Sequence, residues 1–416
     1  MKFALVNPAW EFREATFICP QPHYPLPLLF AFERLRAAGQ EAMVLDAQLG
    51  KLSLAQAKRR LDRFKPDYLV VATSPYLFRP CPPPQFGLLR NWLAELDQMA
   101  IKVAIGPLAS LTPALTMRRL DCHVAIRGEP EEVLAELPLR PWSEIEGCCW
   151  MDKDGAHISP SLARSNMRNL GALSFDNYDL ELRRHCHGLV STGGHGGELE
   201  LARKAQGNSN ETVLRGFRER DVQQVLQEID VLVARGVDYI YWTDEIFPVS
   251  RNVEHLLDEI AKRPIRIGLR TRIDLWTEET VDLLGRAHCV SLECDSENDS
   301  QPIPGGRLSN PRICELLIYA RKQIPSVQVN LILGERDEQM HPSSWQGLKR
   351  GGVRVSESAP RFPYPGTSRY EQIFGPPDEY AWERAYHYYF DLFHDQGSSD
   401  FQPHTPPTIE GRECTF

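Results

Sequence analysis

The fold is decided by residues 198–247, whose sequence is ELELARKAQGNSNETVLRGFRERDVQQVLQEIDVLVARGVDYIYWTDEIF. Residues 198–202 alternate at the period of a β-strand, and the apolar side chains of 222–233 recur at the spacing of an amphipathic helix. Gly236 follows the last of them and ends that helix. The stretch therefore predicts a strand, a loop and a helix that lead into a second, parallel strand.

That second strand is expected over 237–242, a β-branched and aromatic run. It delivers Asp244 and Glu245 to its carboxyl end. In α/β barrels the chemistry collects on the loops that follow the strands. The loops 203–214 and 243–248 are therefore the first candidates for a functional site.

The same alternation continues through the rest of the chain. Further strands are expected over 265–271, 289–294 and 327–334, the last strand with its loop over 353–367, and helices over 251–262, 278–285 and 313–323. About six parallel strands then form an α/β domain over 198–370. The remaining segment, 371–416, holds an aromatic helix and a tail, which we expect to cap this domain or to make a subunit contact.

Another α/β domain is expected over 1–150, followed by a linker over 151–197. Helices alternate here with apolar strands, the pattern of a doubly wound parallel sheet. Those strands are expected over 3–7, 41–47, 67–74, 102–106 and 123–132. Ligands of such sheets bind at the carboxyl ends of the strands. The residues at those ends are Asn7, Pro8, Ser74, Gly106, Pro107, Gly128 and Glu129.

The loops at these strand ends exclude one common ligand and favour another. The first loop lacks the G-x-G-x-x-G turn, so a dinucleotide bound in the usual way is not expected. The aromatic residues Trp10, Tyr76 and Phe78 would line a broad, flat ligand, and a corrin is one. The residues leave an alternative open, in which these side chains pack against the second domain.

The composition limits the classes of molecule that the chain is expected to bind. The net charge is −9 and the pI is about 5.8, so a nucleic-acid surface is not expected and a small-molecule partner fits better. The sequence shows neither a signal peptide nor a membrane-length apolar run, which predicts a cytoplasmic protein with no membrane partner. The ten cysteines lack metal-type spacing, so we expect reduced thiols and no metal site. The oligomeric state is left open.

In this arrangement the chain resembles the radical S-adenosylmethionine (SAM) family, in the subclass with an N-terminal cobalamin-binding domain. The segments TDEIF, RTRIDLW, CVSLEC, VQVNLI and FPYPGT occur in the family's order at strand ends. The N-terminal strands are followed by NPAW, TSPYLF, GPLAS and RGEPEEV, which is similar to the cobalamin-binding domain. The resemblance implies a Rossmann-like cobalamin-binding domain and a partial (β/α)6 TIM-type barrel.

The resemblance also implies a set of SAM-binding residues at the barrel strand ends. They are Asp244, Glu245, Arg272, Glu293, Ser296, Glu297 and Asn330. Carboxylates suit the ammonium, sulfonium or ribose of SAM, and an arginine suits its carboxylate. The residues alone equally allow an ion pair between Arg272 and Asp274. Two positions depart from the family: Leu108 replaces a histidine after Gly-Pro, and 294–297 lacks the glycine of Gly-x-Glu-Ser.

The largest departure concerns the iron–sulfur cluster. In the family, the first barrel strand is followed by Arg-Gly-Cys-x-x-x-Cys-x-x-Cys, whose three thiolates hold a [4Fe–4S] cluster. Aligned from Glu200 and Arg203, the motif has Ala205, Ser209 and Thr212 at the cysteine positions. Neither a methyl group nor a neutral hydroxyl replaces a thiolate ligand. We therefore expect no iron–sulfur cluster.

This resemblance leads to three hypotheses about function. The favoured one is a cobalamin-dependent transferase or lyase that uses SAM without the cluster, in polar methyl or alkyl transfer or in ring closure. The second is a pseudoenzyme that holds cobalamin or substrate for a partner, and the third is a catalyst with a different cofactor in the cluster's place. Asp244, Glu245 and Tyr76 are the candidate catalytic residues, with either carboxylate as general base.

Overall fold

The computed structural model describes most of the chain in two compact units. The described residues are 1–10, 24–74, 85–96, 100–175, 188–190, 218–244, 247–296, 310–331, 342–357 and 362–395. The first unit contains the described residues up to 175 together with 362–387. The second contains those from 188 to 357, with 388–395. Among all these residues, no helix is both long and apolar enough to cross a membrane.

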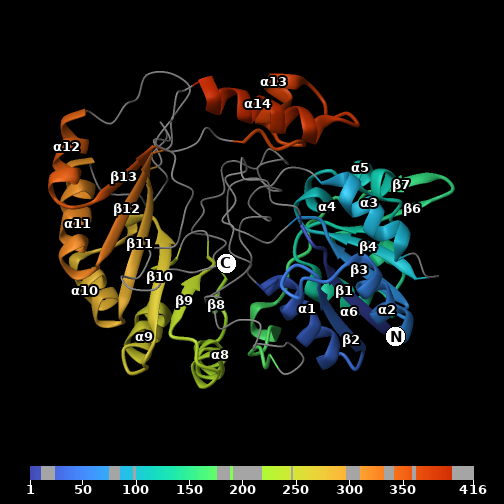
Figure 1. Ribbon diagram of the computed structural model, residues 1–416, viewed down its shortest axis with the longest axis horizontal. Helices are drawn as coiled ribbons and strands as arrows, with labels where there is room; N and C mark the ends of the chain where they lie inside the picture. The colour runs from blue at the N-terminus through green and yellow to red at the C-terminus, as the bar shows by residue number, and fades with distance from the viewer. Residues whose placement is uncertain are drawn as a thin grey trace. The chain divides into compact units, whose positions relative to one another are not determined.

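A seven-stranded sheet organises the first unit (Figure 1). Its order is β2-β1-β3-β4-β5-β6-β7, in which the first five strands are parallel and the last two add an antiparallel hairpin. The strands are β1 (Lys2–Asn7), β2 (Glu41–Asp46), β3 (Tyr68–Ala72), β4 (Ile101–Ile105), β5 (Val124–Ile126), β6 (Cys148–Asp152) and β7 (Gly155–His157).

Helices cover both faces of this sheet because the strand order changes direction at β1. Right-handed crossovers that run in opposite directions place their helices on opposite faces. The helices are α1 (Leu26–Ala37), α2 (Leu54–Phe64), α3 (Phe86–Glu95), α4 (Pro107–Leu111), α5 (Pro113–Leu120) and α6 (Pro130–Glu136), with 3-10 turns η1 (Trp142–Glu144) and η2 (Met167–Asn169). The expected doubly wound α/β sheet is confirmed.

The second unit contains six parallel strands whose order follows the chain, β8 to β13. They are β8 (Gly188–Val190), β9 (Tyr239–Trp242), β10 (Arg266–Thr271), β11 (Cys289–Ser296), β12 (Ser326–Leu331) and β13 (Arg354–Glu357). Every crossover runs in the same direction, so the connecting helices lie on one face. They are α8 (Val222–Ala234), α9 (Arg251–Ile260), α10 (Glu278–Arg286), α11 (Asn310–Gln323) and α12 (Pro342–Arg350), and η5 (Ile273–Leu275) precedes α10.

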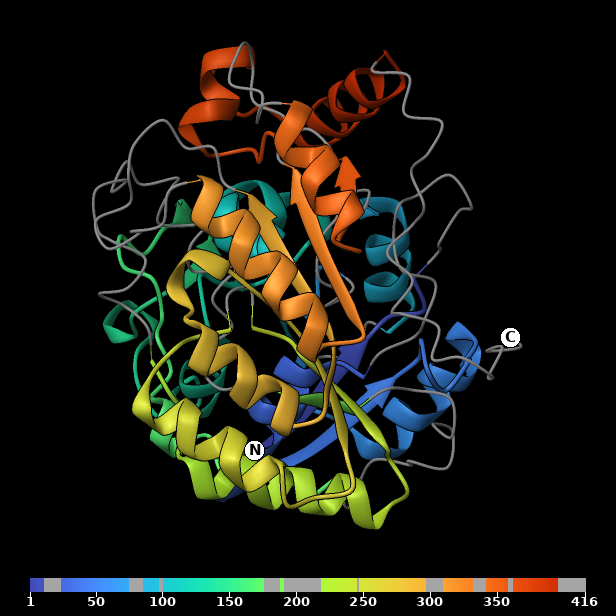
Figure 2. The ribbon, with the colours of Figure 1, turned by 90° about the vertical axis from the view of Figure 1, so that its left-hand side faces the viewer.

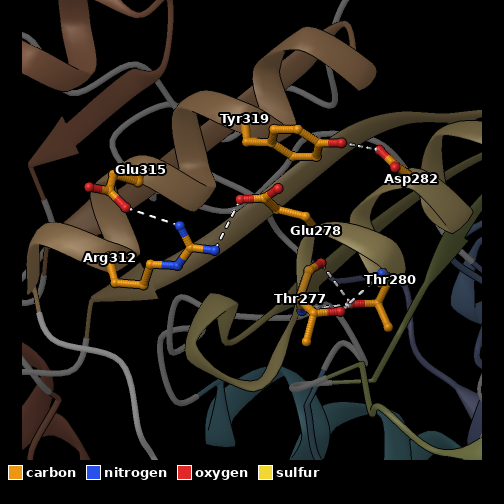
Figure 3. Close-up of polar contacts among 7 residues, drawn as sticks. All are labelled: Thr277, Glu278, Thr280, Asp282, Arg312, Glu315 and Tyr319. Atoms are coloured by element: carbon orange, nitrogen blue, oxygen red, sulfur yellow. Dashed lines mark hydrogen bonds and ion pairs between the residues drawn. The ribbon is translucent and has the colours of Figure 1, made fainter.

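Figure 2 looks onto this helical layer, with its yellow-to-orange helices in front of the strands. Polar contacts join neighbouring helices of the layer. Arg312 on α11 donates to Glu278 on α10 over 3.0 Å, and the Tyr319 hydroxyl donates to Asp282 over 2.7 Å (Figure 3). The layer therefore buries the apolar face of the sheet and keeps its own outer surface polar.

Among the described residues the second sheet begins at β8, ten residues upstream of the strand expected over 198–202. Residues 198–214, which include that expected strand, lie outside the described residues. The last strand, expected with its loop over 353–367, is β13, which ends at Glu357. Residues 362–387, which include α13 (Ser368–Phe374) and the start of α14 (Ala381–Asp395), pack with the first unit. The expectation that 371–416 caps the barrel or makes a subunit contact stays a prediction.

Candidate cofactor and substrate sites

The switch point of the first sheet lies between β1 and β3, where ligands of this strand order bind. Asn7 ends β1 and is 4% exposed. Its side-chain amide donates to Asp46 (3.0 Å), and its carbonyl oxygen accepts from the Trp10 indole N–H (2.9 Å). Trp10 is buried in the hydrophobic core of the unit. Both residues therefore shape the strand end, and the Trp10 ring supports the edge from within the core.

The ends of β3 and β4 are joined by Thr73. Its backbone N–H and its hydroxyl both donate to the Ile105 carbonyl, at 2.9 and 2.7 Å. This contact fixes Ser74, which follows β3 and is 7% exposed. Pro8, at the end of β1, is also buried. Tyr76 and Phe78 lie outside the part of the chain that the structure describes.

Glycines occupy the ends of the next two strands. Gly106 follows β4 with φ of +101° and Gly128 follows β5 with φ of +94°, a backbone region that side chains rarely adopt. Pro107 then starts α4, as proline does well at a first helical position. Each of these two strand ends therefore turns at a residue that has no side chain.

Ser110 on α4 connects these two glycine turns. Its hydroxyl accepts from the Gly128 backbone N–H (3.0 Å), and its carbonyl accepts from Arg127 Nε (3.3 Å). Ser110 is fully buried. The turns at the ends of β4 and β5 therefore form one hydrogen-bonded unit, and displacement of either would break a buried hydrogen bond.

Glu129 has a structural partner. It is 2% exposed, and its carboxylate accepts from the backbone N–H of Ser165 (2.7 Å). The Ser165 hydroxyl donates in turn to Glu131 (2.6 Å). These contacts fasten the segment after the hairpin to the start of α6. Glu129 therefore holds the strand-end turn in shape.

The second sheet has one polar face. Successive side chains of a strand point to opposite faces. On β10, Leu269 and Thr271 are buried whereas Arg266 and Arg270 are partly exposed. Arg270 is in register with Glu293 on β11, which is in register with Gln328 on β12 and then with Arg354 on β13. A row of charged and amide side chains thus crosses four strands. Glu293 was expected from sequence, and its neighbours in the row were not.

Tyr239 lies at the amino-terminal end of the same face. It is 2% exposed, and a Cβ added at Gly268 would lie 2.0 Å from its hydroxyl oxygen. Burial, followed by the charges of Cys289 and Glu293, raises the pKa of Tyr239 far above its usual range. The ring therefore fills the space that glycine leaves and stays protonated beneath the polar row.

Asp244 follows β9 and is 7% exposed. Hydrogen bonds lock the loop beyond it to β10: Phe247 donates from its N–H to the Arg270 carbonyl (2.8 Å) and accepts at its carbonyl from the Thr271 hydroxyl (2.7 Å). The Trp276 indole donates to the same hydroxyl (2.9 Å). These bonds fix Phe247, three residues after Asp244, to the end of β10.

Arg272 forms an ion pair with Asp274, which is one of the two interpretations that the sequence allowed. The guanidinium makes two contacts with the carboxylate, at 3.0 and 2.6 Å, and both side chains are 13% exposed. A bidentate pair of this kind holds the arginine in one orientation. The Arg272 side chain is therefore preorganised at the carboxyl end of β10, beside the loop of Asp244.

The structure leaves several expected residues untested. Glu245 and Glu297 lie outside the described residues, as do the side chains of Ser296 and Asn330, although these two residues belong to β11 and β12. Ala205, Ser209 and Thr212 are outside as well. Among the residues that are described, no group of three or more His, Cys, Asp or Glu side chains is placed to hold a metal ion.

Comparisons with known proteins identify the fold. No protein-family model matches the sequence, and no curated protein matches it. The structure is similar to TsrM, a radical SAM methyltransferase from Kitasatospora setae solved with tryptophan substrate and a SAM analogue (TM-score 0.69, 18% identity, 89% of this chain and 76% of TsrM covered). TsrM with cobalamin and a [4Fe–4S] cluster gives a TM-score of 0.68 at 17% identity, over 89% and 75% of the two chains. The cobalamin-dependent SAM radical enzyme OxsB gives 0.63 at 15% identity, over 95% of this chain and 55% of OxsB. The chain therefore shares the α/β fold of cobalamin-dependent radical SAM enzymes.

Proposed function

We propose that this chain is a cobalamin-dependent enzyme that uses SAM in polar methyl or alkyl transfer, or in ring closure, without an iron–sulfur cluster. The fold shared with TsrM and OxsB supports an enzyme that uses cobalamin and SAM. TsrM is a radical SAM methyltransferase solved with cobalamin bound, and OxsB is a cobalamin-dependent SAM radical enzyme. Cobalamin would supply the alkyl-transfer chemistry when bound. The residues of the chain would orient the reactants, exclude water and move the proton.

One observation carries the cluster-free part of the proposal. The second sheet begins at β8, so a cysteine motif after its first strand would have to follow Val190. With Gly194 at the motif's glycine, the three cysteine positions fall on His195, Leu199 and Ala202. The alignment of the motif thus moves by ten residues, and no thiolate appears at either placement. No cysteine occurs between positions 186 and 289.

The residues present fit the two small molecules. A corrin suits the edge formed by Gly106 and Gly128, where the backbone carries no Cβ. In the second unit, the sulfonium and amino acid parts of SAM suit Asp244 and the charged row that includes Glu293. Asp244 is nearly buried after the end of β9, so it is our candidate for the base that takes a proton from the acceptor.

The test is anaerobic loading of the purified chain with hydroxocobalamin, iron and sulfide, followed by desalting, metal analysis and a SAM turnover assay. We expect stoichiometric cobalt without iron, and SAM consumption. Asp244→Asn should lower turnover by about 100-fold or more while cobalt is retained. Asp258→Asn, at an exposed site on α9, is the matched control and should turn over normally.

Each other result has a definite meaning. Stoichiometric iron would refute the cluster-free reading. Cobalt without SAM turnover would favour a cobalamin-binding pseudoenzyme, a function to which the missing glycine of 294–297 also points. A chain that retains neither cobalt nor iron would refute cobalamin binding itself.

A further inference from the structure

The far end of the chain contributes to the core of the first unit. Trp382 is 2% exposed and belongs to the same hydrophobic core as the strands of the seven-stranded sheet, with Phe362 and Tyr364 packed against that core. Gly366 approaches Leu111 so closely that an added Cβ would lie 2.9 Å from the Leu111 carbonyl oxygen. Residues 362–387 are thus an integral part of this unit.

A chain of buried hydrogen bonds leads from this segment to α4. The Trp382 indole donates to the Thr112 hydroxyl (2.9 Å), which donates to the Leu108 carbonyl (3.2 Å). The Thr116 hydroxyl donates to the same carbonyl (2.8 Å). Trp382 therefore acts on α4 through Thr112, without touching the turn that precedes the helix.

A second contact holds the segment on α5. Arg119 donates to the Glu379 carbonyl (2.9 Å) and to the Glu383 carboxylate (2.7 Å). Its guanidinium also lies 3.9 Å from the centre of the Phe86 ring, a cation–π contact. These contacts fix the start of α14 against α5, so that the indole of Trp382 reaches Thr112 in one orientation.

The position of α4 depends on such contacts because the helix is short. It has five residues, too few to be stable alone, and it begins directly after Gly106. Ser110 on this helix also accepts the hydrogen bond from Gly128. The Gly106 turn directly precedes α4 and the Gly128 turn is hydrogen-bonded to it, so both turns depend on the position of α4. Hydrogen bonds through Thr112 to Trp382 hold α4 in that position.

We propose that Trp382 is a positioning residue for the cofactor edge of the first unit, so that the C-terminal segment 362–387 is required for tight cobalamin binding. This inference rests on the cobalamin function proposed above. It places a determinant of binding outside the N-terminal domain, whose strand ends carry every expected contact residue. The segment would act by holding the Gly106 and Gly128 turns in the conformation that accepts a corrin.

The test compares two tryptophan variants of the full chain. Trp382→Phe keeps an aromatic ring and removes the indole N–H. Trp142→Phe is the matched control, because its indole donates to the Leu137 carbonyl (3.3 Å) in the same unit, away from α4. Hydroxocobalamin is titrated by visible absorbance, and the visible circular dichroism of the bound corrin is recorded at saturation. Thermal unfolding is followed for both variants.

We expect Trp382→Phe to weaken cobalamin binding by about 5- to 10-fold and to change the dichroism of the bound corrin. Trp142→Phe should change neither, even if it lowers the melting temperature equally. Thr112→Val should reproduce the Trp382→Phe result, which keeps the test decisive if one variant folds poorly.

If neither Trp382→Phe nor Thr112→Val changes the cobalamin affinity or the dichroism, the inference about Trp382 is wrong and the proposed cobalamin function still stands. An equal loss in Trp142→Phe would also overturn it, since the effect would then be general destabilisation. A wild-type chain that holds no cobalamin would instead overturn the proposed function, and this inference with it.

Discussion

The seven-stranded sheet and the six-stranded sheet of this chain differ in the polarity of their faces. Every residue of β3 in the first sheet is buried, whereas β10 in the second sheet has the partly exposed Arg266 and Arg270 on one face. Helices on both faces require apolar residues on both faces, while helices on one face leave the other free to be polar. Among the described residues, β3 is therefore buried on both faces, whereas the second sheet carries charged side chains on one face.

This difference divides the proposed work between the units. At the edge of the first sheet, the determinants are backbone turns such as those of Gly106 and Gly128, held by buried hydrogen bonds. On the second sheet they are side chains such as Arg270 and Glu293, in register across strands. In this proposal the edge of the first sheet binds a large cofactor through the shape of its backbone, and the polar face of the second sheet binds a polar substrate through charged side chains.

The sharpest test of the difference places the same residue on an internal strand of each sheet. Val70→Glu puts a carboxylate at a fully buried position of β3 and should cost about 4 kcal/mol or more. Gln328→Glu puts it between Glu293 and Arg354, where repulsion and attraction offset, and should cost about 1 kcal/mol or less. Urea denaturation measures both. Equal losses would mean that the polar face is packed like a core.

A smaller effect is expected where Tyr239 lies over Gly268. Gly268→Ala should cost about 1–3 kcal/mol, because the new methyl group meets a buried ring. In a Tyr239→Phe background the 2.0 Å contact is gone, so the same substitution should cost about 1 kcal/mol less. Gly87→Ala is the control, since a Cβ there meets nothing within 4 Å. Additive losses in the double variant would show that the two positions are not coupled.

The sequence predicted most elements of both sheets because apolar runs such as 67–74 and helical stripes such as 222–233 carry strong periodicity. It did not predict β8, which is the first strand of the second sheet among the described residues. The β8 strand has only three residues and begins with Gly188, whereas 198–202 alternates clearly. Short strands are chosen by their pairing with a neighbour, here β9, and that pairing cannot be read locally.

The candidate sites were less predictable than the fold. Strand ends were correctly located as positions, but the hydrogen bonds of Asn7 with Asp46, of Trp10 with Gln48 and of Glu129 with Ser165 join residues far apart along the chain. The polar row was missed although its signal was present. Arg270 and Gln328 stand at alternate positions in apolar strands, and such alternation in a parallel strand indicates a face without helices.

The smallest effect is expected at the exposed antiparallel edge of the first sheet. The backbone N–H of Asp154 and then the His157 ring hold the pKa of Asp152 below its usual range. The folded state therefore favours the carboxylate, and its stabilisation is present above the ordinary carboxyl pKa and is lost as the pH falls through and below it. Asp152→Ala should lower the melting temperature slightly at pH 7, and this difference should vanish near pH 2. Lys153→Ala, the neighbouring control, should show no such dependence. A difference that persists at low pH would assign the effect to the turn's conformation and not to its charge, and the edge would then resemble the rest of the first sheet in depending on backbone shape.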